Sequence, residues 1–253
     1  MNIIAIIQAR MSSSRLPKKV LLPLADKPVL EHVVSRLRYC KTFKNIIVAT
    51  SIHHSDEPIV NFCKKNNIDF FRGSSNDVLD RYYQAATINK ADIIVRITAD
   101  CPVIDPQIVD EVVKGFLSDD YDLYGLSGSF PDGLDCQVFK YSALKKAWND
   151  SILLSDREHV GSYIEKTRPD LFKIGGLEKF KNLEGYRWTL DQYEDYVFLN
   201  EIFSNLYKQD SLFLTNDILK LLNSNPKLKN INSNIMRNEG YLKSIQQDQI
   251  DKI

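Results

Sequence analysis

Short apolar runs alternate with segments of helical spacing through the first half of the chain, and this alternation limits the fold more than any other feature of the sequence. The apolar runs are rich in β-branched residues, as is typical of buried strands, and they cover residues 3–7, 45–49, 68–71 and 92–97. Segments with helical period or helix-start signals follow them, at residues 28–37, 55–58, 76–89 and 105–116. This order predicts an α/β fold with a doubly wound, mostly parallel sheet.

The pattern changes at about residues 121–182, where the runs become shorter and glycines interrupt them. Within this stretch we expect strands at 123–128 and 134–139 and helices at 141–148 and 155–167. The alternation returns with a strand expected at 186–190 and helices at 192–207 and 215–222, before an asparagine- and lysine-rich tail that we expect to pack loosely. We therefore expect one domain, 1–253, with a small inserted subdomain at about 121–182. We expect this subdomain to provide a binding pocket for an acceptor molecule and a contact with a second subunit.

Charge and cysteine content exclude several classes of function. The chain has 33 Lys and Arg against 33 Asp and Glu, so no global field attracts it to nucleic acid or to a membrane surface. The longest apolar runs are far too short to span a bilayer. The four cysteines show no C-x-x-C spacing and no secretory signal precedes them, which predicts reduced thiols in a cytoplasmic protein.

The loop after the first apolar run concentrates positive charge. Residues 8–19 read Gln-Ala-Arg-Met-Ser-Ser-Ser-Arg-Leu-Pro-Lys-Lys, with cations at Arg10, Arg15, Lys18 and Lys19. Because the loop leaves a strand at its carboxyl end, where open α/β sheets bind ligands, we interpret it as a polyphosphate site. The alternative is an ordinary solvated basic loop. The loop is neither a Walker A sequence nor a dinucleotide fingerprint.

Two aspartates occupy positions that suit a Mg²⁺ ligand. Asp100 is the first acidic residue after the apolar run 92–97, in Thr-Ala-Asp-Cys-Pro, and Asp191 follows the run 186–190. Mg²⁺ in nucleotide sites takes one or two carboxylates together with phosphates and water. The structural alternatives are a turn aspartate at Asp100 and a capping-box-like pair of Asp191 with Glu194.

A further strand-to-helix connection, residues 71–82, carries Arg72, Gly73 and Ser74. Gly73 permits close backbone approach and its neighbours offer hydrogen-bond donors, so the segment suits a base or ribose, whereas a capped connection is the structural alternative. On the following helix we expect Asp77 and Arg81 to pair one turn apart. These residues do not identify the base.

Taken together, the basic loop resembles the N-terminal signature of the sugar cytidylyltransferases, the family of the keto-deoxyoctulosonate and acylneuraminate enzymes. The signature is Arg-x-x-Ser-x-Arg-x-Pro-x-Lys over residues 10–19, and the surrounding Gln-Ala-Arg-Met and Ser-Ser-Ser-Arg-Leu-Pro resemble the spore-coat-polysaccharide SpsF branch most closely. The resemblance implies a nucleotidyltransferase, GT-A-like fold and a loop that holds the triphosphate of CTP through Arg10, Ser13, Arg15, Lys18 and Lys19.

The resemblance also implies roles for residues outside the loop. Asp100 and Asp191 match the metal-binding pair, and Arg72, Gly73 and Ser74 match the nucleotide-recognition loop. Two motifs within 121–182, residues 131–138 and 155–160, match segments that we assign to the acceptor site: Asp132, Asp135, Arg157, Glu158 and His159. Ser155 and Glu158 also form a plain S-x-x-E capping box, and His159 could equally be a satisfied interior histidine.

This sequence departs from the expected pattern at two places in the acceptor motifs. It has Cys136-Gln137 where an acidic residue is expected nearby, and Gly161-Ser162 where Thr-Pro is expected. The departures indicate an unusual acceptor.

The reaction that the resemblance implies is attack of a sugar-acid hydroxyl, such as that of a 3-deoxy-2-keto acid, on the α-phosphate of CTP. Pyrophosphate leaves, Mg²⁺ is the cofactor, Arg10, Arg15, Lys19 and Asp100 carry the catalysis, and a cytoplasmic homodimer serving surface-glycan synthesis is expected. The alternatives are a glycosyltransferase that uses a nucleotide sugar, or a non-catalytic nucleotide-binding subunit.

Overall fold

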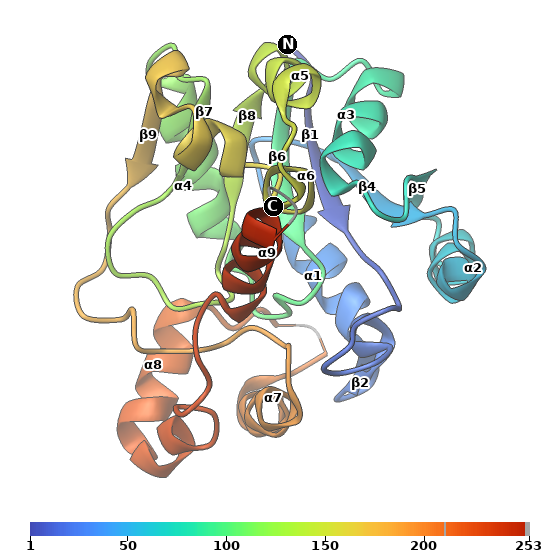
Figure 1. Ribbon diagram of the computed structural model, residues 1–253. Coiled ribbons are helices and arrows are strands. Elements are labelled where there is room, and N and C mark those ends of the chain that lie inside the picture. Colours follow the sequence, from blue (N-terminus) through green and yellow to red (C-terminus); the bar gives the residue numbers. More distant parts are fainter. Residues whose placement is uncertain (210, 251–253) are drawn as a thin grey trace.

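The computed structural model describes residues 1–209 and 211–250, and a seven-stranded sheet forms its centre (Figure 1). The strands of this sheet are β1 (Ile3–Gln8), β4 (Asn45–Ser51), β5 (Asp69–Gly73), β6 (Ile93–Thr98), β7 (Leu123–Leu126), β8 (Gln137–Lys140) and β9 (Ile174–Leu177). Their order across the sheet is β5-β4-β1-β6-β8-β7-β9. A separate ribbon pairs β2 (Pro23–Leu24) with β3 (Lys27–Pro28).

The strands of the first half of the chain run parallel, as predicted. β1 pairs in parallel with β4 and β6, and β4 with β5, whereas β8 is antiparallel to both β6 and β7. Gln8 at the end of β1 lies opposite Thr98 at the end of β6. The loops that leave these two strands therefore start side by side at one edge of the sheet.

Helices cover both faces of the sheet, which confirms the doubly wound α/β architecture. The α-helices are α1 (Val29–Leu37), α2 (Glu57–Lys65), α3 (Val78–Ile88), α4 (Pro106–Leu117), α5 (Tyr141–Asp150), α6 (Leu154–Glu158), α7 (Tyr193–Leu206), α8 (Thr215–Ser224) and α9 (Glu239–Ile250). Short turns of 3₁₀ helix are η1 (Lys19–Leu21), η2 (His54–Asp56), η4 (Pro169–Leu171) and η5 (Pro226–Asn230), and η3 (Tyr163–Thr167) is a π-helical turn.

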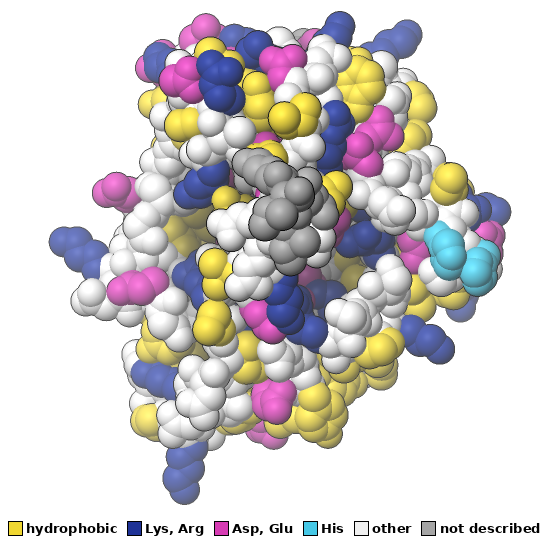
Figure 2. All heavy atoms as spheres, viewed as in Figure 1, with side chains coloured by type: hydrophobic (Ala, Val, Ile, Leu, Met, Phe, Trp, Pro, Cys, Tyr) yellow, Lys and Arg dark blue, Asp and Glu magenta, His cyan; other side chains and the backbone are white. Residues whose placement is uncertain are grey.

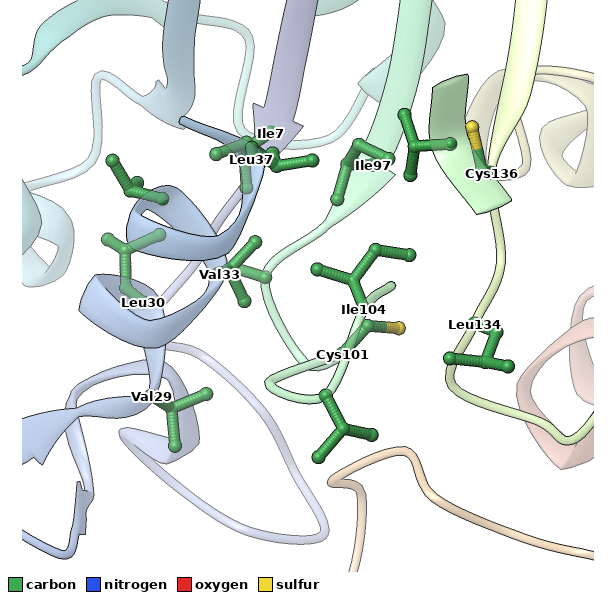
Figure 3. Close-up of a cluster of buried hydrophobic side chains, with 14 of the residues drawn as sticks. Ile7, Val29, Leu30, Val33, Leu37, Ile97, Cys101, Ile104, Leu134 and Cys136 are labelled. Carbon is green, nitrogen blue, oxygen red and sulfur yellow. The ribbon is translucent and has the colours of Figure 1, made fainter. Parts of the chain in front are cut away.

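Side chains of the central strands alternate between two hydrophobic cores. Ile7 and Ile97 enter the core formed with α1 and α4, and Figure 3 shows both beside Val33 and Leu37 of α1. Ile4 and Ile6 point to the opposite face, against α3 and α5. Burial on both faces accounts for the continuous apolar sequence of β1.

The stretch 121–182 contributes three strands to the main sheet, including β9, which the sequence pattern did not indicate. The single helix expected at 155–167 is wrong, because Val160 has a positive φ of 24° and Gly161 follows it, so the chain forms α6 and then η3. The strand expected at 186–190 is also wrong: only an isolated bridge joins Arg187 to Asp132. The subunit contact expected in this stretch stays a prediction.

The tail is more ordered than its composition indicates. Its last described element, α9, packs against α6 and lies across the front of the sheet in the view of Figure 1. None of the helices described is long and apolar enough for a transmembrane span. All four cysteines are buried and free, as predicted.

Candidate active site

A pocket of about 1030 Å³ opens where β1 and β6 end. Its walls come from the basic loop, the ends of β1, β6 and β8, the stretch 121–182, the segment 187–191 and α9. Figure 2 shows Lys, Arg, Asp and Glu side chains around recesses in the middle of this face. Small-molecule pockets commonly have volumes of roughly 300–1,000 Å³, so this one has room for two substrates.

The basic loop is held in shape by a buried carboxylate. Asp56 accepts a hydrogen bond from the backbone N–H of Met11 at 2.8 Å, and the Met11 carbonyl accepts from the N–H groups of Ser13 and Lys18. This closed turn directs four of the predicted residues into the pocket lining: Arg10, Ser13, Arg15 and Lys19. Lys18 has a φ of 63°, is exposed and lies outside the lining.

Lys19 lies between the two predicted metal-binding carboxylates. Its Nζ is 2.6 Å from Oδ2 of Asp100 and 2.5 Å from Oδ1 of Asp191, and Arg15 approaches Asp191 to 3.0 Å. Burial opposes charge on Asp191, but Lys19 and Arg15 outweigh that effect and lower its pKa to about 2. Asp191 therefore remains ionised, and the side chains of Asp100 and Asp191 converge on one ammonium group.

Backbone bonds bring the two aspartates together although 91 positions separate them in the chain. The N–H of Leu190 donates to the carbonyl of Asp100 at 2.8 Å, and the Thr189 hydroxyl donates to the same carbonyl at 3.3 Å. The expected capping pair of Asp191 with Glu194 is wrong. Asp195 caps α7 instead, because its carboxylate accepts from the backbone N–H groups of Asp191 and Gln192.

Arg187 connects this carboxylate pair to the rest of the site. Its buried guanidinium bonds bidentately to Asp195 at 2.9 and 3.0 Å and also reaches Asp132 at 2.9 Å and Asp191 at 3.4 Å. Asn232 donates to both Asp195 and the Arg187 carbonyl at 2.9 Å. The network fixes the orientation of Asp191, and the sequence analysis did not single out Arg187.

The arrangement of Asp100 and Asp191 fits a Mg²⁺ ion. Both carboxylates already lie within hydrogen-bonding distance of the Lys19 ammonium, so the two side chains would hold a divalent cation without rearrangement of the backbone. Within residues 1–209 and 211–250, no group of three or more His, Cys, Asp and Glu side chains is placed to hold a metal. A pair of carboxylates suits Mg²⁺, which completes its shell with phosphates and water.

Four of the five predicted acceptor residues line the pocket: Asp132, Asp135, Glu158 and His159. Burial and the neighbouring Asp135 raise the pKa of Asp132 to about 7, against the opposing effect of Arg187. The turn that carries these two carboxylates requires Gly133, whose φ is 104° and where a Cβ would lie 2.5 Å from the backbone of Trp188. Glycine therefore permits the close approach of the two segments, and the N–H of Trp188 donates to the carbonyl of Asp132 at 2.6 Å.

Glu158 and His159 extend from the end of α6 toward different partners. Glu158 pairs with Arg10 at 2.6 Å, which ties the basic loop to this part of the pocket. His159 lies 3.0 Å from the Ser244 hydroxyl and makes an edge contact with Tyr241, both in α9. Burial and the charge of Arg96 lower the pKa of His159 to about 4, so the ring is neutral at pH 7.

Other predicted residues lie outside the pocket lining. Arg72 pairs with Glu57 at 2.9 Å, and Gly73 and Ser74 also do not contribute to the lining. Arg157 bonds to the Ser151 carbonyl and to Asp77.

The expected pairing of Asp77 with Arg81 is therefore wrong. Asp77 caps α3 through the N–H of Asp80 and pairs with Arg157, while Arg81 donates to the Ser74 carbonyl. Ser155 is likewise not an N-cap residue, since Leu153 occupies that position before α6.

Several pocket residues were missed by the sequence analysis because nothing in their local sequence marks them. They lie on strands of the sheet, in η3 and in α9: Gln8, Arg96, Glu165, Glu239 and Tyr241. A lone arginine inside an otherwise apolar strand, Arg96 in β6, is the one signal that was available.

Comparison with known proteins agrees with this geometry. A family model described as cytidylyltransferase matches residues 4–228. The chain is 40% identical over 245 residues to an uncharacterised protein of Methanocaldococcus jannaschii, covering 95% of this chain and 98% of the relative. It is 32% identical over 232 residues to the spore coat polysaccharide biosynthesis protein SpsF of Bacillus subtilis, covering 89% of this chain and 95% of that protein.

More distant and structural similarities point the same way. A 3-deoxy-manno-octulosonate cytidylyltransferase of Pelobacter propionicus is 32% identical over 122 residues, 47% of this chain and 46% of that protein. The solved structure of a cytidylyltransferase from Leptospira borgpetersenii superposes with a TM-score of 0.86 at 33% identity, covering 94% of this chain and 99% of the other. The chain therefore belongs to the cytidylyltransferase family and is a CTP-dependent nucleotidyltransferase.

Proposed function

We propose that the protein transfers the cytidylyl group of CTP to a hydroxyl of a sugar acid and releases pyrophosphate. One observation carries this proposal: a basic loop and a pair of aspartates face the same 1030 Å³ pocket at the carboxyl edge of the sheet. The loop supplies guanidinium groups for phosphate and the aspartates supply ligands for a divalent cation.

The proposed reaction forms one P–O bond and breaks another. The sugar oxygen bonds to the α-phosphorus, the bond to the bridging oxygen of the β-phosphate breaks, and the hydroxyl proton passes to water. Arg10 and Arg15 bind and orient the triphosphate, and Lys19, once released from its carboxylates, binds the leaving phosphates. Catalysis is then mainly positioning and stabilisation of charge on the pyrophosphate.

Asp100 and Asp191 would hold Mg²⁺ in this reaction. The ion, when bound, polarises the α-phosphate and helps to orient the attacking oxygen. Arg187 keeps Asp191 in place through Asp195, so the carboxylate needs no reorganisation when the nucleotide enters.

The acceptor class rests on the similarity to an enzyme named for 3-deoxy-manno-octulosonate. Similarity to a protein of spore coat polysaccharide biosynthesis supports a role in making a surface polysaccharide. These statements go beyond family membership and form part of the proposal.

Release of pyrophosphate from CTP tests the proposal directly. The purified protein is incubated with CTP, Mg²⁺ and each of a set of acidic sugars, including 3-deoxy-manno-octulosonate and N-acetylneuraminate. We expect acceptor-dependent pyrophosphate release that EDTA abolishes. A glycosyltransferase would release none, and neither would a non-catalytic binding subunit.

Variants assign the activity to this pocket. Asp191→Asn is expected to lower kcat/KM at least 100-fold, because loss of the Asp191 carboxylate removes one ligand of the proposed cation. Asp69→Asn is the matched control, since Asp69 is exposed on β5 and outside the pocket lining. Retention of near wild-type turnover by Asp191→Asn would refute the assignment of the metal pair.

A further inference from the structure

One face of the sheet changes from apolar to polar where it enters the pocket. On that face Ile6, Ile94 and Phe139 belong to the core, and the next residues outward along the three strands are Gln8, Arg96 and Gln137. Strand register places Arg96 directly between Ile6 of β1 and Gln137 of β8. An arginine thus lies in the floor of the pocket with its backbone fixed on both sides.

The guanidinium of Arg96 donates its hydrogen bonds to uncharged side chains. Its Nη1 donates to Oε1 of Gln137 at 2.9 Å and its Nη2 donates to Oε1 of Gln8 at 3.4 Å. Its Nε is buried and has no hydrogen-bond partner. In the part of the chain that the structure describes, no carboxylate lies within ion-pair distance of Arg96, whereas Arg10, Arg15 and Arg187 each pair with at least one.

Glu165, an acidic residue in the same part of the pocket, is hydrogen-bonded to Gln137 and not to Arg96. Glu165 accepts a hydrogen bond from Nε2 of Gln137 at 2.9 Å, so the Gln137 amide separates its carboxylate from Arg96. A Cβ at Gly161 would lie 2.9 Å from the same amide nitrogen, so the glycine leaves space for Gln137 to take this position. Glu165 and Arg96 therefore interact electrostatically without forming an ion pair. A guanidinium that is hydrogen-bonded only to amides, and whose Nε has no partner, favours an anionic ligand.

The two departures from the family pattern noted in the sequence meet at this point. Gln137, the first residue of β8, belongs to the pair Cys136-Gln137 near which an acidic residue is expected, and Gly161-Ser162 stands where Thr-Pro is expected. An acidic side chain beside Arg96 would neutralise it, whereas Gln137 leaves the charge available. Residues that follow Gly161, including Ser162 and Lys166, complete this part of the pocket.

We propose that Arg96, assisted by Lys166 at the rim, binds the carboxylate of the acceptor and so selects acidic sugars over neutral ones. The inference rests on the proposed function and deepens it. The pocket residues Gln137, Ser162, Glu165 and Lys166 come from the stretch 121–182, whereas the proposed phosphate-binding side chains come from the loop at 10–19. The two oxygens of a carboxylate match the paired N–H donors of a guanidinium. Neutral hydroxyl groups do not match them in this way.

The test compares an acid with its neutral isostere. Steady-state pyrophosphate release is measured with 3-deoxy-manno-octulosonate and with its 1-carboxamide, at saturating CTP and Mg²⁺. We expect wild type to prefer the acid in kcat/KM by about 10- to 100-fold, the range for hydrogen bonds to a charged group. Arg96→Gln should raise KM for the acid and remove this preference while leaving KM for CTP unchanged.

Two further variants separate recognition from folding. Arg96→Lys keeps the charge without the paired donors and should retain part of the preference. Arg38→Gln, an exposed arginine at the end of α1, is the matched control and should behave as wild type. Thermal denaturation and CTP titration of each variant confirm that the fold and the nucleotide site persist.

The possible results distinguish a failure of the role of Arg96 from a failure of the proposed reaction. Undiminished preference for the acid in Arg96→Gln, or equal use of acid and carboxamide by wild type, would overturn the inference and leave nucleotidyl transfer standing. Absence of pyrophosphate release with every acid would overturn the proposed function and this inference together.

Discussion

Replacement of Lys19 by methionine removes the cation that lies between Asp100 and Asp191. The side chains of these aspartates are only 24% and 21% exposed, so solvent compensates them incompletely. In the native state the pKa of Asp191 is about 2 against an ordinary value of 3.8. A difference of that size corresponds to roughly 2 kcal/mol of stability at neutral pH.

The loss predicted for Lys19→Met is about 2 kcal/mol. This is less than the 3–5 kcal/mol typical of a broken buried pair, because Arg15 and Arg187 remain near Asp191 and the pocket admits some water. A carboxylate with a lowered pKa stabilises the fold above its unfolded pKa, and the effect is lost as the pH falls through the folded value. The difference from wild type should therefore be constant between pH 6 and 8.

Urea unfolding followed by tryptophan fluorescence measures this loss, since Trp188 is fully buried beside the site. Lys18→Met is the matched control, because Lys18 is exposed and outside the pocket. Addition of 10 mM MgCl₂ should stabilise Lys19→Met more than wild type, by about 1.4 kcal/mol if the dissociation constant is about 1 mM. Equal stability of the two variants without Mg²⁺ would refute the reasoning.

Four further predictions concern neighbouring parts of the site. Arg15→Ala should lower kcat/KM for CTP by about 100-fold or more in the pyrophosphate assay, with Arg38→Ala as control. Asp195→Asn should cost about 3 kcal/mol in urea unfolding, because it leaves the buried Arg187 without its bidentate partner, while Glu194→Gln costs little. The neutral ring of His159, with a pKa near 4 in the fold, contributes its full stability above the unfolded pKa of 6.5; about 3 kcal/mol should be lost as the pH falls to 4, and His159→Gln should flatten that pH profile. A chain ended after residue 235 should still unfold cooperatively in urea, since α9 contributes to neither hydrophobic core, but should show a KM for CTP raised about 10-fold.

The order of strands and helices in the first half of the chain follows from local pattern. Runs such as 3–7 and 92–97 are apolar on both faces because helices cover both, and caps such as Asp105 before α4 mark helix starts. The register that places the ends of β1 and β6 together is a consequence of parallel pairing. For this reason the basic loop and Asp100 were predicted to share one site.

The structure of the second half of the chain depends on long-range contacts that no local sequence pattern reveals. The segment 186–190 is apolar enough for a strand, yet it makes one bridge to Asp132 and is held by side chains of Asp195 and Asn232. The composition of the tail predicts loose packing, but α9 finds partners in α6 and His159.

The individual site residues divide in the same way. Arg10, Arg15, Lys19 and Asp191 were found because they follow a strand or precede a helix within a recognisable motif. Arg96 lies inside a strand, so only the register of β6 against β8 shows that it enters the pocket. Residues 72–74 have the composition of a binding loop but lie outside the pocket lining, with Arg72 bound to Glu57.

Isothermal titration of the protein with CTP, with and without Mg²⁺, tests the central claim that the basic loop and the aspartate pair form one nucleotide site. UTP, ATP and GTP are titrated in parallel, and Arg15→Ala and Asp191→Asn are compared with wild type. The account predicts CTP-selective binding that Mg²⁺ strengthens, that Arg15→Ala weakens and that loses its Mg²⁺ dependence in Asp191→Asn. Binding of CTP that neither Mg²⁺ nor these two substitutions alters would contradict it.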